Sequence, residues 1–370
     1  MLVNSVVLLL VIIIGGLFLI NHKIDYNSNK IRIIYVIIVS IILILQSGLR
    51  NWAVGPDTYA YYLWFDDIKY EEWNFLFAKF LLFYQHGIGK DPGYEILVKL
   101  FQIFSGNYQM YLFFVAILWF SSLGFFLMKF TTNFKQLIPA YIFYLVMFFS
   151  FYSITGIRQT IAMSLCIFSF HWIDKRKFLP VLLLIILAST LHKSSLIFIL
   201  AYFIYTFKYT KSIYIVSFLV FPIIFALKNV IFNILISSSG YELYDEFEGA
   251  GTYVFSSLLM LLGFFILLQN KDLLKINEKT QGILNIFAMA IILTPLTFVN
   301  PNAMRIVMYF SFFIIIIIPY LIESYNYKGI QVRKIVSLMI YILLIILFIR
   351  TNSSFEYKFF WQEMPLGENY

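Results

Sequence analysis

Long apolar runs separated by short polar connections make up most of the chain. A bilayer core of about 30 Å is crossed by about 20 residues of helix, and by fewer where neighbouring helices allow the bilayer to thin or the helix to break. The two short runs around His192 can also be interpreted as one long helix. Counted separately, they complete a pattern of twelve predicted membrane helices: Leu2–Ile20, Ile31–Gln46, Tyr108–Met128, Leu137–Ser153, Ile157–Ile173, Phe178–Leu191, Ser194–Phe207, Ser212–Leu227, Tyr253–Gln269, Gly282–Val299, Ile306–Ile322 and Ile335–Ile349. We therefore predict an all-α polytopic membrane protein of about 12 transmembrane helices, with residues 1–350 as a single transmembrane domain.

Composition agrees with this assignment. Of the 370 residues 61% are hydrophobic, only 12% are charged, and the mean hydropathy is +0.85. A soluble domain with these values would expose extensive apolar surface. The first run is too long for a signal peptide and lacks a basic segment before it, so we expect it to remain as a helix. The single cysteine, Cys166, lies in an apolar run, which predicts a small core residue and argues against a disulfide framework or a thiolate metal cluster.

The distribution of lysine and arginine among the connections predicts the orientation. One set of alternate connections holds 16 of the 27 basic residues and only 5 of the 19 acidic residues, and the other set holds the rest. Basic loops usually stay in the cytoplasm. We therefore expect both termini outside, with an extracytoplasmic loop at about residues 47–107, a second outer loop at about 236–252 and an outer C-terminal tail at 351–370. The pI near 9.2 then reflects topology and contact with anionic membrane lipid, and it implies no nucleic-acid partner.

The long outer loop contains two carboxylates beside glycine–proline turn signals, Asp57 and Asp91. Asp57 can cap a helix that begins at Thr58, or it can partner Arg50 or act as a general base. Between the two turns, residues 75–84 carry apolar side chains suited to a helix lying in the membrane interface. This loop is therefore the first place to look for chemistry.

Aromatic residues gather in the same loop. Tyrosine and tryptophan concentrate at bilayer interfaces without any ligand, and their amphipathic rings also suit sugars. The second outer loop is acidic and aromatic as well, and it can be either a solvated loop or a contact for sugar hydroxyls. In the long outer loop, an interface position and a sugar contact both stay open for the aromatic residues, which are Tyr59, Tyr61, Tyr62, Trp64 and Trp73.

Two arginines begin apolar runs that enter the membrane from the predicted outer side. Arg158 follows Gly156, which permits a sharp reversal, and Arg305 follows a proline that ends the preceding run. A cation in the first turn of a helix is unfavourable unless an anion compensates it, whereas an arginine and a helix N-terminus together form a phosphate site. Arg50 and His192 also end apolar runs on this side, so we expect a bound anion such as a lipid pyrophosphate. The alternative is that each arginine extends to the lipid headgroups.

His192 and Lys193 lie between two apolar runs. Polar residues at membrane depth generally face a cavity or a partner. His192 can be a base, a donor to phosphate or a structural histidine. The chain has four histidines, and they show no spacing typical of metal ligands, so we expect no metal.

Five motifs follow one another along the chain: Arg50 with Val54-Gly55-Pro56-Asp57 and Tyr61, Asp91-Pro92-Gly93-Tyr94, Gly156-Ile157-Arg158-Gln159 with Ala162, His192-Lys193-Ser194, and Asn300-Pro301 through Arg305 with Tyr309-Phe310. In this order and spacing they resemble the EpsG family of Wzy-like polymerases, which make bacterial surface polysaccharides. The resemblance spans about residues 50–319. Asp91 departs from the pattern, in which glutamate is expected.

The resemblance implies a metal-independent, cofactor-free glycosyltransferase of the bacterial inner membrane, with a GT-C-like architecture. It would transfer a growing glycan from undecaprenyl pyrophosphate to a lipid-linked oligosaccharide repeat at the outer face, and its partners can include a chain-length regulator. The catalytic residues implied are Asp57 and His192. The residues implied for pyrophosphate or substrate binding are Arg50, Arg158, Gln159, Lys193, Arg305 and Tyr309, and those for sugar contact are Tyr61, Asp91, Tyr94 and Glu95.

Other classes remain open. A lipid-linked oligosaccharide flippase or another transporter also has about twelve helices, but it usually carries its charges within helices around a central cavity. An O-antigen ligase shares the outer chemistry and differs in its acceptor. A membrane acyltransferase would need a supporting constellation around His22 or His171, and the sequence offers none.

Overall fold

The computed structural model describes residues 2–20, 28–208, 210–237, 253–268, 278–324, 342, 344, 346–349 and 356–364. Every named element within these residues is a helix, and an isolated β-bridge joins Arg50 to Phe359. The predicted helix Ile335–Ile349 and the predicted outer loop 236–252 lie mostly outside the described residues. The chain divides into two compact units: unit 1 is Met1–Glu71, Glu95–Phe168 and Ile318–Tyr370, and unit 2 is Glu72–Tyr94 and Ser169–Ile317.

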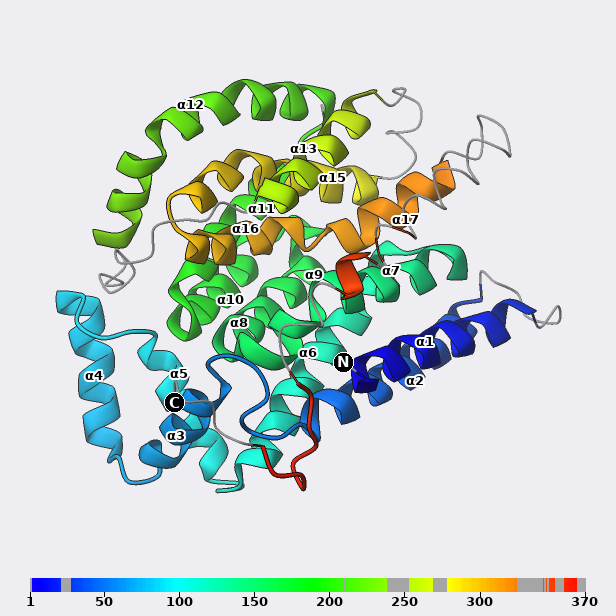
Figure 1. Cartoon of the computed structure of the whole chain (residues 1–370). Coiled ribbons are helices and arrows are strands. Elements are labelled where there is room, and N and C mark those ends of the chain that lie inside the picture. Colours follow the sequence, from blue (N-terminus) through cyan, green and yellow to red (C-terminus); the bar gives the residue numbers. More distant parts are fainter. Residues whose placement is uncertain are drawn as a thin grey trace. The chain divides into compact units, whose positions relative to one another are not determined.

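Unit 1 is built from the N-terminal helices and the helices that follow the long loop (Figure 1). Its elements are α1 (Leu2–Ile20), α2 (Asn29–Gly48), α3 (Thr58–Ile68), most of α5 (Pro92–Gln102), α6 (Tyr108–Phe130), α7 (Phe134–Met147), the π-helix η1 (Ser150–Thr155), α8 (Ile157–Phe168) and the end of α17 (Ile314–Ser324).

Glycines set the close packing of α2 against α6 in unit 1. A Cβ added at Gly48 would lie 2.5 Å from the Phe113 ring, and one added at Gly124 would lie 2.9 Å from Val36. Small residues allow helix backbones to approach closely in membranes, where packing rather than the hydrophobic effect drives association. The α2–α6 pair therefore forms a rigid support for the loop that leaves α2.

Unit 2 contains α4 (Trp73–His86), α9 (Phe170–Ile173), α10 (Phe178–Leu191), the 3-10 helix η2 (Lys193–Phe198), α11 (Ile199–Tyr205), α12 (Thr210–Ser237), α13 (Tyr253–Leu268), α15 (Glu278–Leu293), η4 (Thr294–Phe298), η5 (Pro301–Ala303) and α16 (Met304–Ser311). Polar side chains connect its helices. The Tyr214 hydroxyl donates to the Leu284 carbonyl at 2.8 Å, and Asn285 Nδ2 donates to the Phe207 carbonyl at 2.6 Å. These bonds fix α12 and the end of α11 against α15.

Helix length corrects the predicted count of twelve spans. Five described stretches are long and apolar enough to cross a bilayer, and a sixth follows if the bent pair Pro301–Ser311 and Ile314–Glu323 is one span. Four other apolar stretches have only 10–17 residues, which at about 1.5 Å per residue fall short of a bilayer core. The described chain is thus a polytopic helical membrane protein, with full-length spans at Leu2–Ile20, Asn29–Gly48, Tyr108–Phe130, Thr210–Ile234 and Glu278–Phe298.

Helices predicted from apolar runs are too long where the α-helix gives way to a π-helix or divides into two helices. The bounds of α1 and α10 are as predicted. In contrast, α7 ends at Met147 and gives way to a π-helix, and the run predicted for Ile157–Ile173 divides at Ser169 into α8 and α9. The opposite error occurs at α12, which continues past Leu227 and Lys228 to Ser237. Composition stays apolar through the breaks, so it does not mark them.

Candidate functional site

Arg158 lies in the first turn of α8, as predicted, directly after the π-helix η1. Gly156 joins the two elements with φ of −86°, which is ordinary for any residue. The space beside the Gly156 Cα is crowded instead, because an added Cβ would lie 2.7 Å from the Phe151 ring. Lack of space, and not a special backbone conformation, therefore explains glycine at this junction.

The Arg158 guanidinium is enclosed by aromatic side chains of α3. Its Nε donates to the Tyr61 hydroxyl at 3.1 Å, and its Cζ lies 5.7 Å from the Tyr61 ring centre and 5.2 Å from that of Trp64. The residue is only 8% exposed. The positive end of the α8 dipole disfavours this cation, and the faces of two electron-rich rings favour it. A buried cation at a helix N-terminus is well suited to bind an anion.

The loop before α3 holds these rings in place. Gly55 has φ of +95°, and a Cβ there would lie 2.9 Å from both Ile154 and Thr155, so the loop packs directly on η1. At the other end of α3, Gln102 donates to the Phe65 carbonyl at 2.6 Å. α3 is thus fixed at both ends, which positions Tyr61 and Trp64 against Arg158.

Asp57 precedes α3 and occupies the predicted capping position. Its φ is +66°, a conformation that costs energy for a residue with a side chain, and its side chain makes no capping hydrogen bond to the helix in the described structure. Its carbonyl accepts from the Tyr61 amide at 3.2 Å. The Asp57 side chain is exposed. The position was predicted correctly, whereas the capping bond expected from it is replaced by a strained, exposed carboxylate.

Arg50 is buried in the structure of unit 1. Its Nη1 donates to the Ser47 carbonyl at 2.7 Å and the Ser153 carbonyl at 3.1 Å, and its Nη2 donates to the Ile154 carbonyl at 3.1 Å. Burial lowers the pKa of this guanidinium. The contacts given for Arg50 within the described residues include no ion pair with Asp57, which was one of the roles left open for that carboxylate. These contacts favour a structural role for Arg50.

Asp91 and His192 form a buried pair in unit 2, although 101 residues separate them in sequence. His192 Nδ1 lies 3.2 Å from Asp91 Oδ2, and the Lys193 amide donates to Asp91 Oδ1 at 3.0 Å. Asp91 has φ of +49°, and a Cβ on Gly93 would lie 2.5 Å from Thr190 Oγ1, so the turn before α5 packs tightly on the end of α10. The sequence places Asp91 beside a turn and His192 between two apolar runs, but it carries no signal of their pairing.

Two further candidate residues, Lys193 and Tyr94, lie next to the Asp91–His192 pair in unit 2. The Lys193 ammonium lies 4.8 Å from the centre of the Phe83 ring in α4, which is a cation–π distance. Tyr94 and Glu95 are buried in the first turn of α5, and the Tyr94 amide donates to the Asp91 carbonyl at 3.0 Å. Lys193 and Tyr94 thus accompany the Asp91–His192 pair in unit 2.

Arg305 lies in the first turn of α16, as predicted. The Asn300 side chain accepts from the Asn302 amide at 2.8 Å, and η5 leads into α16 at Met304. Arg305 is partly exposed. Tyr309, one turn on, is buried with its ring 6.4 Å from that of Phe198, a position typical of a core residue.

In unit 1, Arg158 and Tyr61 are in direct contact, and Gln159 follows buried in α8. Unit 2 contains the Asp91–His192 contact and Arg305 on a separate helix start. Sequence reasoning identified Tyr61 only as a sugar contact and did not predict that it binds the guanidinium. It also did not assign Asp91 the role of positioning His192.

Comparisons with known proteins complete this description. Searches among curated proteins and among solved structures found no match. The profile of the EpsG family matches residues 33–362, which is nearly the whole chain and includes every candidate site residue. The chain therefore belongs to the EpsG family.

Proposed function

We propose that this protein is a glycan polymerase of the bacterial inner membrane that uses a lipid-diphosphate-linked sugar as donor at the outer face. The observation that carries the proposal is the Arg158 site. A buried guanidinium at the N-terminus of α8, framed by Tyr61 and Trp64, is suited to a diphosphate next to a sugar. Family membership supports a polysaccharide polymerase.

In the proposed reaction, a sugar hydroxyl of a lipid-linked acceptor attacks the anomeric carbon of the donor glycan. A new glycosidic bond forms, the bond to the diphosphate oxygen breaks, and the lipid diphosphate leaves with the electron pair. The protein has to neutralise that developing charge and accept the hydroxyl proton. We assign the first task to Arg158, and Arg305, in the first turn of α16 in unit 2, is the other arginine that we propose for pyrophosphate binding.

His192 and Asp57 are the candidates for accepting the proton. The Asp91 carboxylate next to Nδ1 favours the tautomer protonated at that nitrogen, so proton transfer would use Nε2. Such an orienting carboxylate is a common support for a histidine base. Asp57 is exposed at a strained position beside α3, where a carboxylate can reach a substrate hydroxyl.

The test begins with deletion of the gene in its host and separation of the surface glycan on a gel. Loss of a polymerase leaves single repeats on the lipid carrier, loss of a flippase leaves none outside, and loss of a ligase leaves unattached polymer. Arg158→Ala should reproduce the single-repeat pattern and lower the transfer rate about a hundredfold or more. Arg158→Lys should restore only part of the rate, because an ammonium lacks the bidentate fork.

Lys129→Ala is the matched control. Lys129 is also a cation near an aromatic ring at a helix end, with its Nζ 6.0 Å from the centre of the Phe125 ring, but it lies in a predicted cytoplasmic connection. It should leave polymerisation unchanged. Normal polymer from correctly inserted Arg158→Ala protein would refute the assignment.

A further inference from the structure

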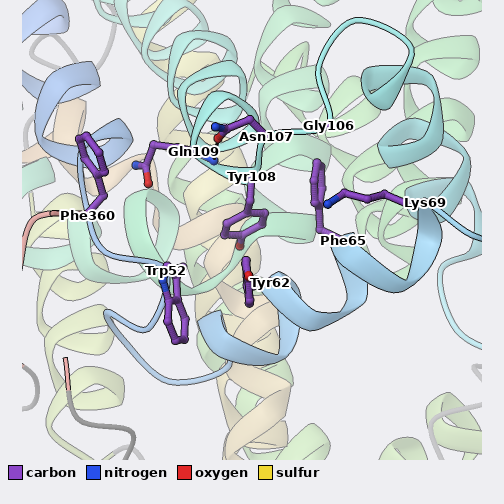
Figure 2. Close-up of a pocket in the computed structure, with 9 residues that line it drawn as sticks. All are labelled: Trp52, Tyr62, Phe65, Lys69, Gly106, Asn107, Tyr108, Gln109 and Phe360. Carbon is purple, nitrogen blue, oxygen red and sulfur yellow. Dashed lines mark hydrogen bonds between the residues drawn. The ribbon is translucent and has the colours of Figure 1, made fainter. Parts of the chain in front are cut away.

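A hollow lies in unit 1, and the Arg158 guanidinium is not part of its lining. The hollow has a volume of about 330 Å³. Figure 2 shows the side chains that converge on it from the loop after α2, from α3, from the start of α6 and from the C-terminal segment. Those that matter for the argument are Trp52, Tyr62, Phe65, Tyr108, Gln109 and Phe360. The volume is at the lower end of the range for small-molecule pockets.

Aromatic rings form much of its wall. The rings of Trp52 and Tyr62 stack with centres 4.9 Å apart and planes 25° apart, and Tyr108 meets Tyr62 edge-on at 5.4 Å. Trp52 and Tyr62 are only partly buried, so their faces reach the hollow. Tyr59 also packs on Trp52, with ring centres 5.2 Å apart, so the pocket wall is an aromatic cluster on which an apolar C–H surface of a pyranose ring can pack.

Polar groups complete the lining. The Gln109 amide nitrogen donates to the Arg50 carbonyl at 3.1 Å and also to the Gly48 carbonyl, which turns the amide oxygen away from them. Tyr108 is only 7% exposed, and its hydroxyl has no hydrogen-bond partner among the residues that the structure describes. The hydroxyl oxygen has almost no exposed surface, so a ligand in the pocket meets the Tyr108 ring and the Gln109 amide.

The charge of the pocket argues against a second phosphate site. Lys69 is the one basic residue of its lining, and its ammonium is already bonded to the Asp66 carboxylate. Its Nζ also lies 5.6 Å from the centre of the Phe65 ring. A neutral, hydroxyl-bearing ring fits this lining better than an anion does.

α3 connects the pocket to the Arg158 site. Tyr61 and Trp64 are three residues apart and face Arg158, whereas Tyr62 and Phe65, also three apart, line the pocket. Successive helix residues differ by about 100°, so the two pairs lie on different faces of one helix. A glycan with its diphosphate at one face can therefore extend toward the other.

We propose that this aromatic pocket binds a neutral sugar residue of the glycan away from the bond-forming end. The identity of that glycan rests on the proposed polymerase function, whereas sugar binding by the pocket does not. Binding of a remote sugar holds the chain during successive transfers, because contacts with non-reacting parts of a substrate contribute to its retention and orientation. The pocket thus affects the length of the polymer.

The binding experiment uses the full-length protein in nanodiscs and oligosaccharides made by partial acid hydrolysis of the host's surface polysaccharide. Trp52→Ala should weaken binding by about tenfold or more, since it removes the tryptophan ring from the aromatic cluster. Tyr62→Ala removes the second ring of the stacked pair, so about a five- to tenfold loss is expected. Trp73→Ala is the control, because Trp73 packs on Phe77 in α4 outside the lining and should have no effect.

The same variants in cells give the second measurement. Trp52→Ala and Tyr62→Ala should shift the polymer to shorter chains, whereas Arg158→Ala should stop polymerisation. Wild-type affinity and wild-type chain length in the folded Trp52→Ala protein would overturn the pocket proposal while leaving the polymerase proposal intact. Normal polymer in the deletion strain would overturn the polymerase proposal, and the oligosaccharide titration would still decide the pocket.

Discussion

Arg50 and Arg158 are both buried arginines of unit 1, and their surroundings separate their roles. Arg50 donates to the carbonyls of Ser47, Ser153 and Ile154, so backbone oxygens compensate its charge. Arg158 instead lies in the first turn of α8, where it donates to the Tyr61 hydroxyl and lies against the ring faces of Tyr61 and Trp64. The first arrangement is typical of a structural residue, and the second of a ligand-binding one.

Arg50→Ala should therefore destabilise the protein. It leaves the carbonyls of Ser153 and Ile154 buried without a charged donor, which is expected to cost about 3 kcal/mol or more. Thermal unfolding in detergent should show a lowered Tm, with Arg50→Lys intermediate. Arg158→Ala should change the Tm much less. A stable but inactive Arg50→Ala protein would instead assign Arg50 to substrate binding.

The Asp91–His192 pair allows a second test at this scale. Asp91→Asn keeps an oxygen that can accept from the Lys193 amide, but it can place an NH₂ group opposite His192 Nδ1. If His192 is the base, the transfer rate should fall by about a hundredfold with little change in Tm. The rate of lipid-linked repeat polymerisation in membranes measures this. An unchanged rate in the Asp91→Asn protein would favour Asp57 over His192 as the group that accepts the hydroxyl proton.

At the scale of helices, packing depends on positions where a side chain has no room. Gly48→Ala puts a Cβ 2.5 Å from the Phe113 ring, so the α2–α6 contact has to open. Gly16→Ala in α1 is the matched control, because nothing lies within 4 Å of its Cβ. The control should be neutral or more stable by up to about 1 kcal/mol, since alanine favours helix.

Gly48→Ala should lower the Tm relative to both the wild type and the control, and the comparison by thermal unfolding in one detergent checks this. Equal Tm values for the two variants would mean that Phe113 rotates away without cost. The α2–α6 approach would then not be the support of the loop that carries Arg50 and α3.

The apolar pattern predicted which segments are helical, and it predicted Arg158 and Arg305 at helix starts, because both signals are local. It could not predict the π-helix at Ser150–Thr155 or the division at Ser169, since these depend on packing and leave the composition apolar. Nor could it pair Asp91 with His192 or Arg158 with Tyr61. Such contacts join segments about a hundred residues apart, and a single sequence does not show which distant residues meet in the fold.

For the molecule as a whole, the proposed chemistry requires that the long loop and the sites beside it face outward. Basic residues lie mainly in the connections on the opposite side of the membrane from this loop. Basic connections usually stay in the cytoplasm, which predicts that the long loop faces outward. The chain offers a simple way to measure it. Its one cysteine, Cys166, is fully buried and can be replaced by alanine, so a new cysteine reports its own position.

Two exposed positions suit the measurement. Tyr70, between α3 and α4, is 82% exposed, and Lys177, before α10, is exposed in a connection predicted to be cytoplasmic. In spheroplasts, a membrane-impermeant maleimide should label Tyr70→Cys within minutes and Lys177→Cys only after permeabilisation. Both variants need wild-type polymerisation to count, because a misinserted protein would label wrongly. Labelling of Lys177→Cys alone in sealed spheroplasts would invert the topology. It would put Arg158 and the aromatic pocket on the side where no lipid-linked repeat is polymerised.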